Sequence, residues 1–330
     1  MDTFGLTLAC RRYDRTSPVL TGEVGLPGVE LRPIEMTNTA AMFNGVFTGE
    51  FDAGEMSLAE LVYYTSRGQN EFLAIPVFPY RMFRHGYIFT SRTAALAVGE
   101  DLSGRRVAFP RVVLTAGVWT RGLLVEEYGV SPTDTSWFYG SLHHWDVPGE
   151  QVTPRDGATL RWIPTEGMEP AVAVEGALLA GDVDALCTTR IPAETAPGGR
   201  VKRLFEDFPD VEAAYFKKTG IYPIMHVLAL RKSVIEAHPD LPRNLFQTFV
   251  DAKALSTRRI REDASVSLVW KDHYVERERE VFDGDPWAYG LEKNRHVLAR
   301  FLSYCYDQGV STREMQPEEL FVPDTCGLSE

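Results

Sequence analysis

Short apolar runs alternate with helix-forming stretches from the start of the chain, and this alternation constrains the fold more than any other feature. We expect strands at 4–9, 29–34 and 51–55, with helices at 39–48 and 58–67. Asn38 is expected to cap the first helix and Ser57 the second, with Glu60 placed as in a capping box. This order predicts an open parallel sheet, whose ligands lie at the carboxyl ends of its strands.

The apolar run at 72–89 interrupts this alternation, because it reads as one long strand with no helix inside it. It contains Arg81, Arg84 and His85. Arginine is rarely buried without an anionic partner, so these side chains indicate either a bound anion or an internal ion-pair network. In an extended segment alternate residues share a face. We therefore expect Arg81 and His85 to face a cleft together, with Arg84 pointing the other way.

A second alternation follows and predicts a second α/β unit. It comprises strands at 106–109, 136–139, 160–163 and 183–188 and helices at 115–128 and 169–180. A strand at 224–230 and helices at 241–261, 276–280 and 294–308 complete the chain. We therefore expect an α/β protein of two lobes joined by two crossing strands. Lobe 1 takes residues 1–90 together with 222–330, including the C-terminal helices, and lobe 2 takes 91–221.

Composition narrows the function classes. The chain has 330 residues, a net charge of −12 and an isoelectric point near 5.2, which argues against a nucleic-acid partner. Local groups of cations still allow a small anionic ligand; they are Arg11, Arg12 and Arg15, then Arg81, Arg84 and His85, then Arg105 and Arg106. No stretch reaches the roughly 18 apolar residues of a membrane span. The sequence leaves a homo-oligomer open.

The four cysteines have no CxxC spacing and are expected to be free thiols in a reducing compartment. The N-terminus has no basic region, and its first strand begins at the fourth residue, so we expect a cytoplasmic protein.

We expect no metal, because His143 and His144 are adjacent and the other potential ligands lack ligand spacing. We also expect no cofactor, because the chain has no P-loop, GxGxxG or GxSxG motif.

Several segments together carry a family resemblance. They are LAC at 8–10, YDRT at 13–16, FDAGEMSL at 51–58, IPVFP at 75–79, RMFRH at 81–85, TGIYPIMHV at 219–227, PWAYG at 286–290 and NR at 294–295. In these segments the chain resembles the 4,5-dihydroxyphthalate decarboxylase family, enzymes built on a type 2 periplasmic-binding-protein fold. The resemblance runs from residue 6 to about 323. The chain departs from it at 140–151, where His143-His144-Trp145 stands in the second lobe, so the departure concerns the identity of the substrate.

The YDRT segment supplies candidate site residues at the end of the first strand. Arg15 could bind a carboxylate with both nitrogens of its fork, and Asp14 could orient it or accept a phenolic proton. Tyr13 is a further candidate for substrate binding. The alternative is an ordinary turn in which Asp14 caps Ser17.

The remaining candidates lie on later elements. Glu55 could act as a base if a dry setting raises its pKa, or it could neutralise a nearby arginine. Ser57 and Thr115, which begin two expected helices, are candidates for substrate binding. His226 lies in the second crossing strand. It could face the same cavity as His85, although a lone histidine on an apolar strand is more often a core residue.

The resemblance implies decarboxylation of 4,5-dihydroxyphthalate to protocatechuate without a cofactor, because the phenolic ring itself takes up electron density. Arg15, Arg81 and Arg84 would hold the carboxylates. Glu55 or Asp14 would take the phenolic proton, and His85 or His226 would protonate the ring, with His85 as the hypothesis. Two alternatives remain: a cytoplasmic solute-binding protein or sensor for an aromatic or dicarboxylic anion, and a related lyase on the same scaffold.

Overall fold

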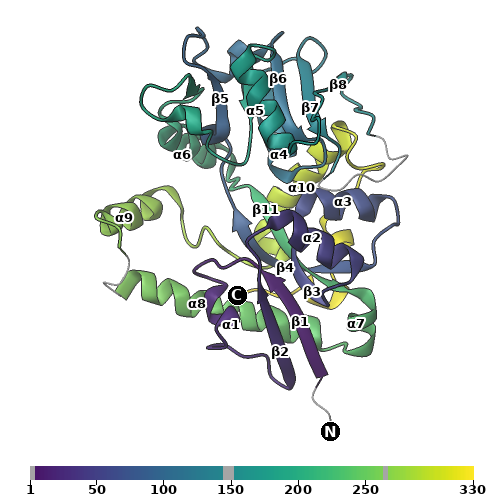
Figure 1. Ribbon diagram of the computed structural model, residues 1–330. Coiled ribbons are helices and arrows are strands. Elements are labelled where there is room, and N and C mark those ends of the chain that lie inside the picture. The colour runs from purple at the N-terminus through teal and green to yellow at the C-terminus, as the bar shows by residue number, and fades with distance from the viewer. Residues whose placement is uncertain (1–3, 144–151, 263–266) are drawn as a thin grey trace.

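The computed structural model describes residues 4–143, 152–262 and 267–330, and its strands form two mixed sheets. Figure 1 shows one sheet above the other, with α3, α4 and α10 near the junction. The first sheet has the order β2-β1-β3-β11-β4. Its strands are β1 (Phe4–Cys10), β2 (Val29–Glu35), β3 (Ala53–Ser57), β4 (Phe72–Arg81) and β11 (Ile224–Arg231). Strand β1 is parallel to β2 and β3, whereas β11 is antiparallel to β3 and β4.

The second sheet has the order β10-β5-β9-β6-β7-β8. Its strands are β5 (Ile88–Ser91), β6 (Arg106–Arg111), β7 (Ser136–Ser141), β8 (Leu160–Trp162), β9 (Ala185–Cys187) and β10 (Val201–Arg203). The central β6 is parallel to β7 and β9, and β5 is antiparallel to β9 and β10. The chain passes between the sheets twice, from β4 to β5 and from β10 to β11. The predicted lobe boundaries stay a prediction; the one after residue 90 cuts through β5.

Ten α-helices are assigned within the described residues. They are α1 (Ser17–Leu20), α2 (Thr39–Thr48), α3 (Leu58–Ser66), α4 (Thr115–Tyr128), α5 (Pro170–Ala180), α6 (Phe208–Thr219), α7 (Lys232–Ala237), α8 (Leu241–Glu262), α9 (Lys271–Val281) and α10 (Leu291–Asp307). The sequence predicted most of these, but not α1, α6 and α7. The Asn38 side chain caps α2 by accepting a hydrogen bond from the Ala41 amide, as predicted.

The predicted long strand at 72–89 is wrong. Strand β4 ends at Arg81, and a 3-10 turn at His85–Tyr87 precedes β5, which belongs to the other sheet. The turn is closed by a hydrogen bond from the Tyr87 amide to the Arg84 carbonyl. Because strand alternation stops at Arg81, the expected facing of Arg81, Arg84 and His85 does not hold beyond that point.

The C-terminal helices return mainly to the first lobe, as predicted. Helix α8 packs on α1 and β4, and α10 packs on α3 and α4, whereas α9 touches α6. Helix α4 joins the two lobes, because Trp119 donates a hydrogen bond to the Ile224 carbonyl and packs against Phe301 of α10. Among the described residues, no helix has both the length and the apolar character needed to cross a membrane.

A segment at 152–158 of the second lobe is tied to the end of α10. The Arg155 guanidinium donates to the carbonyls of Tyr306, Ser311 and Thr312 at 2.8–2.9 Å. The Arg155 amide also donates to the Asp307 carbonyl at 2.7 Å. We call this set of contacts the Arg155 clamp. Together with the two crossings of the main chain, it fixes one lobe against the other.

Candidate active site

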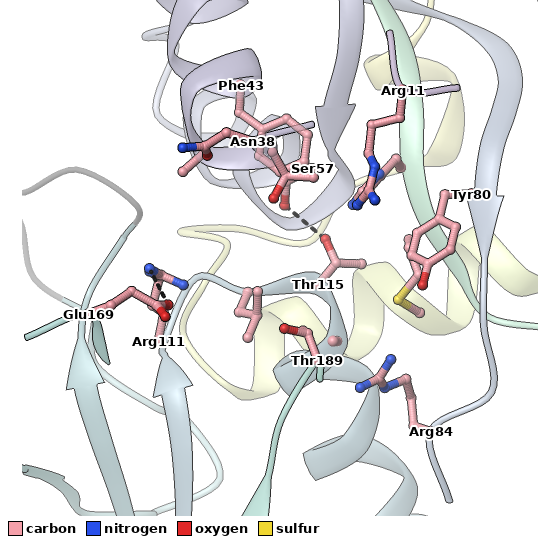
Figure 2. A pocket seen from close by; sticks show the side chains of 16 residues that line it. Arg11, Asn38, Phe43, Ser57, Tyr80, Arg84, Arg111, Thr115, Glu169 and Thr189 are labelled. Carbon is pink, nitrogen blue, oxygen red and sulfur yellow. Dashed lines mark hydrogen bonds and ion pairs between the residues drawn. The ribbon is translucent and has the colours of Figure 1, made fainter. Parts of the chain in front are cut away.

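A cavity of about 470 Å³ lies between the two sheets, and both lobes contribute to its wall. Figure 2 shows its lining side chains. Lining residues come from the loops after β1 and β2, from α2, β3, β4 and β11, from the crossing after β4, and from the second lobe. They include Arg11, Asn38, Phe43, Ser57, Tyr80, Arg84, Arg111, Thr115, Glu169, Thr189 and His226.

Three arginines reach this cavity from different directions (Figure 2). Arg84, 3% exposed, donates from Nη2 to the Thr188 carbonyl at 2.5 Å, but its buried Nε has no acceptor within the described chain. Arg111 lies 3.5 Å from Glu169, and its Nε likewise lacks an acceptor there. Burial lowers the pKa of both guanidinium groups. The Nη1 groups of both arginines also make no hydrogen bond with the described residues, and such unpaired charged donors are suited to an incoming anion.

Arg11 is the third cation of the cavity. Its guanidinium makes no hydrogen bond or ion pair with the residues that the structure describes, although it lies 5.9 Å from the centre of the Tyr13 ring. Glu169 is the one carboxylate side chain among the described lining residues, and it is shared between Arg111 and Arg190. The wall therefore carries more positive than negative charge, in a chain that is acidic as a whole.

His226 presents its ring to the same cavity and is held from behind by Glu55. Its Nδ1 lies 2.6 Å from Glu55 Oε1, and the ring packs against Phe43 and Tyr80. The pairing follows from register, because β11 is antiparallel to β3 and places His226 opposite Ser57, two residues from Glu55 on the same face. An ionised carboxylate accepts a hydrogen, so Nδ1 carries it and Nε2 is left for the cavity.

Glu55 is 0% exposed and does not line the cavity. Burial alone would raise the pKa of its carboxyl, but hydrogen bonds from His226, Tyr13 and the Arg11 amide outweigh it and hold the pKa below its usual value. The expectation of a raised pKa and a base that meets the substrate is therefore wrong. Glu55 is placed to orient His226.

Ser57 and Thr115 both line the cavity and join the lobes there. Their hydroxyl oxygens lie 2.9 Å apart, and Thr115 Oγ1 also accepts a hydrogen bond from the Ala59 amide at 2.9 Å. The predicted capping box is wrong in its cap, because the Ser57 side chain makes no cap bond and Thr115 supplies the acceptor from α4. Thr115 thus holds the start of α3 instead of offering only main-chain N–H groups to a ligand.

Arg81 and His85 lie outside the lining of this cavity, contrary to the expected shared face. Arg81 is buried against the Tyr222 and Ala288 carbonyls and Asn294. His85, 1% exposed, packs among aromatic rings of α4, α6 and their surroundings, and neither ring nitrogen has a hydrogen-bond partner in the described part of the chain. Burial, with the charge of Arg84, lowers the pKa of His85 to about 4. This setting gives no path from His85 to a ligand in the cavity.

The YDRT residues also lie behind the cavity wall. Arg15 donates to the Pro79 carbonyl, pairs with Asp14 at 2.8 Å and lies 3.6 Å from the centre of the Trp287 ring. Tyr13 donates its hydroxyl hydrogen to Glu55 at 2.7 Å. Asp14 and Arg15 therefore satisfy each other, while Tyr13 belongs to the support of His226.

Sequence reasoning missed Arg111 and did not select Arg11 as a site residue. A signal existed for both. Arg111 ends β6 and Arg11 follows β1, and the carboxyl ends of strands are where such sheets place ligands. His143 is buried against the rings of Tyr63 and Tyr64 and does not line the cavity; His144 lies outside the described residues. No cluster of three or more potential metal ligands occurs within the described ranges.

Two lobes of mixed α/β structure around a cationic cavity define the class of periplasmic-binding-protein-like folds, and comparison with solved structures supports it. The periplasmic aliphatic sulphonate binding protein of Escherichia coli superposes with a TM-score of 0.57 at 14% identity, over 98% of this chain and 99% of that one. The alkanesulfonate-binding protein of Xanthomonas axonopodis pv. citri gives 0.54 at 16% identity, over 96% and 98%. These likenesses establish the fold alone.

Sequence relatives establish the family. The chain is 33% identical over 333 aligned positions to a 4,5-dihydroxyphthalate decarboxylase of Comamonas testosteroni, covering 98% of both chains. A protein of that name from Pseudomonas putida is 30% identical over 63% of this chain and 79% of its own length. No family model matches. The chain belongs to the 4,5-dihydroxyphthalate decarboxylase family and is therefore a carboxy-lyase.

Proposed function

We propose that this protein decarboxylates a hydroxylated aromatic dicarboxylic acid, 4,5-dihydroxyphthalate in the first instance, to protocatechuate in the cavity between its lobes. One observation carries the proposal. Arg11, Arg84 and Arg111 converge on a cavity that also receives a histidine backed by a buried carboxylate. The family of the chain makes the substrate of its named relatives the first candidate.

The arginines suit the two carboxylates of such a substrate. Arg84 and Arg111 line the cavity and each donates to a described residue through Nη2, which leaves Nη1 of each planar fork for a carboxylate. Neutral polar side chains of Asn38, Ser57 and Thr189 line other parts of the wall and suit hydroxyl groups. A dianion with phenolic hydroxyls thus matches the wall in both charge and hydrogen bonding.

The chemistry needs proton transfer and little else. Loss of a phenolic proton to solvent water pushes electron density to the ring carbon para to that oxygen, which bears a carboxylate. His226 delivers a proton from Nε2 to this carbon, the ring becomes a dienone, and cleavage of the bond to the carboxylate releases carbon dioxide and restores aromaticity. Glu55 stabilises the protonated imidazole until the transfer.

An assay for product tests the proposal. The purified protein, in excess over 4,5-dihydroxyphthalate, is expected to form one equivalent of protocatechuate per substrate molecule. Chromatography measures the product. His226→Gln should lower kcat by about 100-fold or more, in the range of general acid catalysis. His85→Gln is the matched control and should change kcat by no more than a few-fold, because His85 lies outside the cavity lining.

Three outcomes contradict parts of the proposal. Binding of 4,5-dihydroxyphthalate with no protocatechuate after prolonged single-turnover incubation would favour a binding protein or sensor. Turnover of another hydroxylated aromatic acid, but not of this one, would favour a related lyase on the same scaffold. Loss of activity in His85→Gln with full activity in His226→Gln would reverse the assignment of the proton donor.

A further inference from the structure

We propose that Tyr13 is a positioning residue that acts on His226 through Glu55, fixing the direction of the imidazole ring and how firmly it holds its proton. This inference rests on the proposed role of His226 in decarboxylation. It departs from the expectation that Tyr13 binds substrate, because Tyr13 does not line the cavity.

One carboxylate oxygen of Glu55 is shared between Tyr13 and His226. The Tyr13 hydroxyl donates to Glu55 Oε1 at 2.7 Å, and His226 Nδ1 lies 2.6 Å from the same atom. The other oxygen, Oε2, accepts from the Arg11 amide at 3.1 Å and from the Cys10 thiol at 3.6 Å. Four donors therefore surround a carboxylate that has no exposed surface. Its negative charge is divided between His226 and the three other donors.

Tyr13 is itself held in place. Its ring stacks on Tyr80 with 5.5 Å between centroids and 5° between planes, and the Arg15 guanidinium lies 4.7 Å from its centre. Tyr80 in turn contacts the His226 ring, with 5.1 Å between centroids. A network of packed rings and hydrogen bonds thus links Tyr13 to both sides of His226.

The direction of the effect follows from charge. The Tyr13 hydroxyl stabilises part of the negative charge on Oε1, so removing it leaves more of that charge for the imidazolium, which should keep its proton to higher pH. Removing the Glu55 charge should do the opposite. Charged or titratable groups surround His226 in two ways. Arg11, Tyr80, Arg84, Arg111 and Glu169 line the cavity with it, and Cys10 and Tyr13 bond to Glu55 behind it. A single substitution at position 13 keeps all the other groups.

The test is a titration of His226 in the free protein by NMR, with histidines labelled at Cε1 and the His226 signal identified by its absence in His226→Gln. Tyr13→Phe keeps the stacked ring and removes only the hydroxyl. In this variant the titration midpoint of His226 should move upward by about one pH unit. Glu55→Gln should move the midpoint downward. The falling limb of the pH profile of kcat/KM should move in the same directions.

Tyr222→Phe is the matched control, because it also removes one tyrosine hydroxyl bond, to the Arg81 carbonyl, away from Glu55. Its His226 midpoint should equal that of the wild type. An unchanged midpoint in Tyr13→Phe, with product formed by the wild type, would overturn the role of Tyr13 and leave the reaction standing. A moved midpoint with no product from the wild type would overturn the reaction and leave the Tyr13 coupling standing.

Discussion

At the scale of single residues, the decisive property of the cavity is that its arginines keep donors without protein acceptors in the described chain. Arg106 shows the contrast, because its guanidinium is paired with Asp184 at 2.7 Å on the exposed side of the same strand that ends at Arg111. A saturated guanidinium has little left for a ligand, whereas Arg84 and Arg111 each donate to the described residues through Nη2 and keep Nη1 unpaired there. Burial makes such donors costly until an anion arrives.

Arg111 provides the sharpest test of anion binding, since it is the cavity arginine contributed by β6 of the second lobe. Arg111→Met keeps most of the side-chain volume and removes the charge. Steady-state kinetics should show kcat/KM for 4,5-dihydroxyphthalate reduced by about 10–100-fold, as expected for the loss of hydrogen bonds to a charged group. Arg106→Met is the control on the same strand and should keep wild-type kinetics. An Arg111→Met enzyme with unchanged kcat/KM would remove this arginine from the binding site.

The lowered pKa of His85 should affect how the stability of the protein depends on pH. Its pKa is lowered to about 4 by burial and by Arg84, from an ordinary value of 6.5. Between these two pH values His85 is protonated in the unfolded chain but stays neutral in the native state. The native state therefore loses stability as pH falls through this window. His85→Gln removes that loss. The free energy of unfolding of the variant, relative to that of the wild type, should rise by on the order of 2 kcal/mol when the pH is lowered from 7.5 to 5. Urea unfolding at both pH values measures it.

Glu212 lies in the same region and titrates with the opposite effect, because burial raises its pKa to about 7. Its contribution is present in both proteins and therefore cancels in the difference between them. His296→Gln, at an exposed position on α10, controls for the chemistry of the substitution. If His85→Gln and the wild type lost stability in parallel on acidification, the buried neutral state of His85 would be refuted.

The sequence predicted the direction of single side chains only where a local rule, such as the alternation of faces in a strand, applied. It failed beyond the end of β4. Glu55 and His226 were each named as candidates, but the sequence did not pair them, because nothing in their local sequences states that they bond across 171 positions. Arg84 was expected to point away and Arg81 inward. The reverse is found, because alternation of faces applies only inside a strand and β4 ends at Arg81.

At the scale of elements, the first turn of α3 shows how tertiary contacts replace local capping. The sequence around Ser57 and Glu60 matches a capping box, but the acceptor for the Ala59 amide is the hydroxyl of Thr115, which is 56 positions away and belongs to α4. Local patterns placed the start of α3 correctly without revealing what caps it. Such a cap can be recognised only after the packing of α4 is known.

Thr115→Val should therefore weaken the protein at the start of α3. Valine keeps the shape of threonine but leaves the Ala59 amide and the Ser57 hydroxyl without their shared partner. We expect the free energy of unfolding to fall by about 1–2 kcal/mol, measured by chemical denaturation. Thr115→Ser keeps the hydroxyl and should recover most of the loss. Equal losses in both variants would assign the effect to the missing methyl group and not to the cap.

At the scale of the whole molecule, the lobes are joined at more places than the two crossings of the main chain. Helix α4 contacts β11 and α10 of the first lobe while it also packs on β6 of the second. The Arg155 clamp adds a further connection at the end of α10. The sequence predicted two lobes and the returning helices, but not this clamp, because Arg155 lies in a loop with no periodic pattern and its acceptors are main-chain carbonyls.

The clamp should make the two lobes unfold as one unit, and Arg155→Ala tests this. The variant loses three hydrogen bonds to the carbonyls of Tyr306, Ser311 and Thr312, together with the contact of the guanidinium with the Tyr306 ring. The midpoint of thermal unfolding should fall by about 2–5 °C, and amide exchange should increase at 152–158 and at the end of α10. Arg161→Ala is the control, because this exposed arginine of β8 makes no side-chain hydrogen bond with the described residues. Unchanged exchange in both segments of Arg155→Ala would show that the Arg155 clamp does not hold the lobes together.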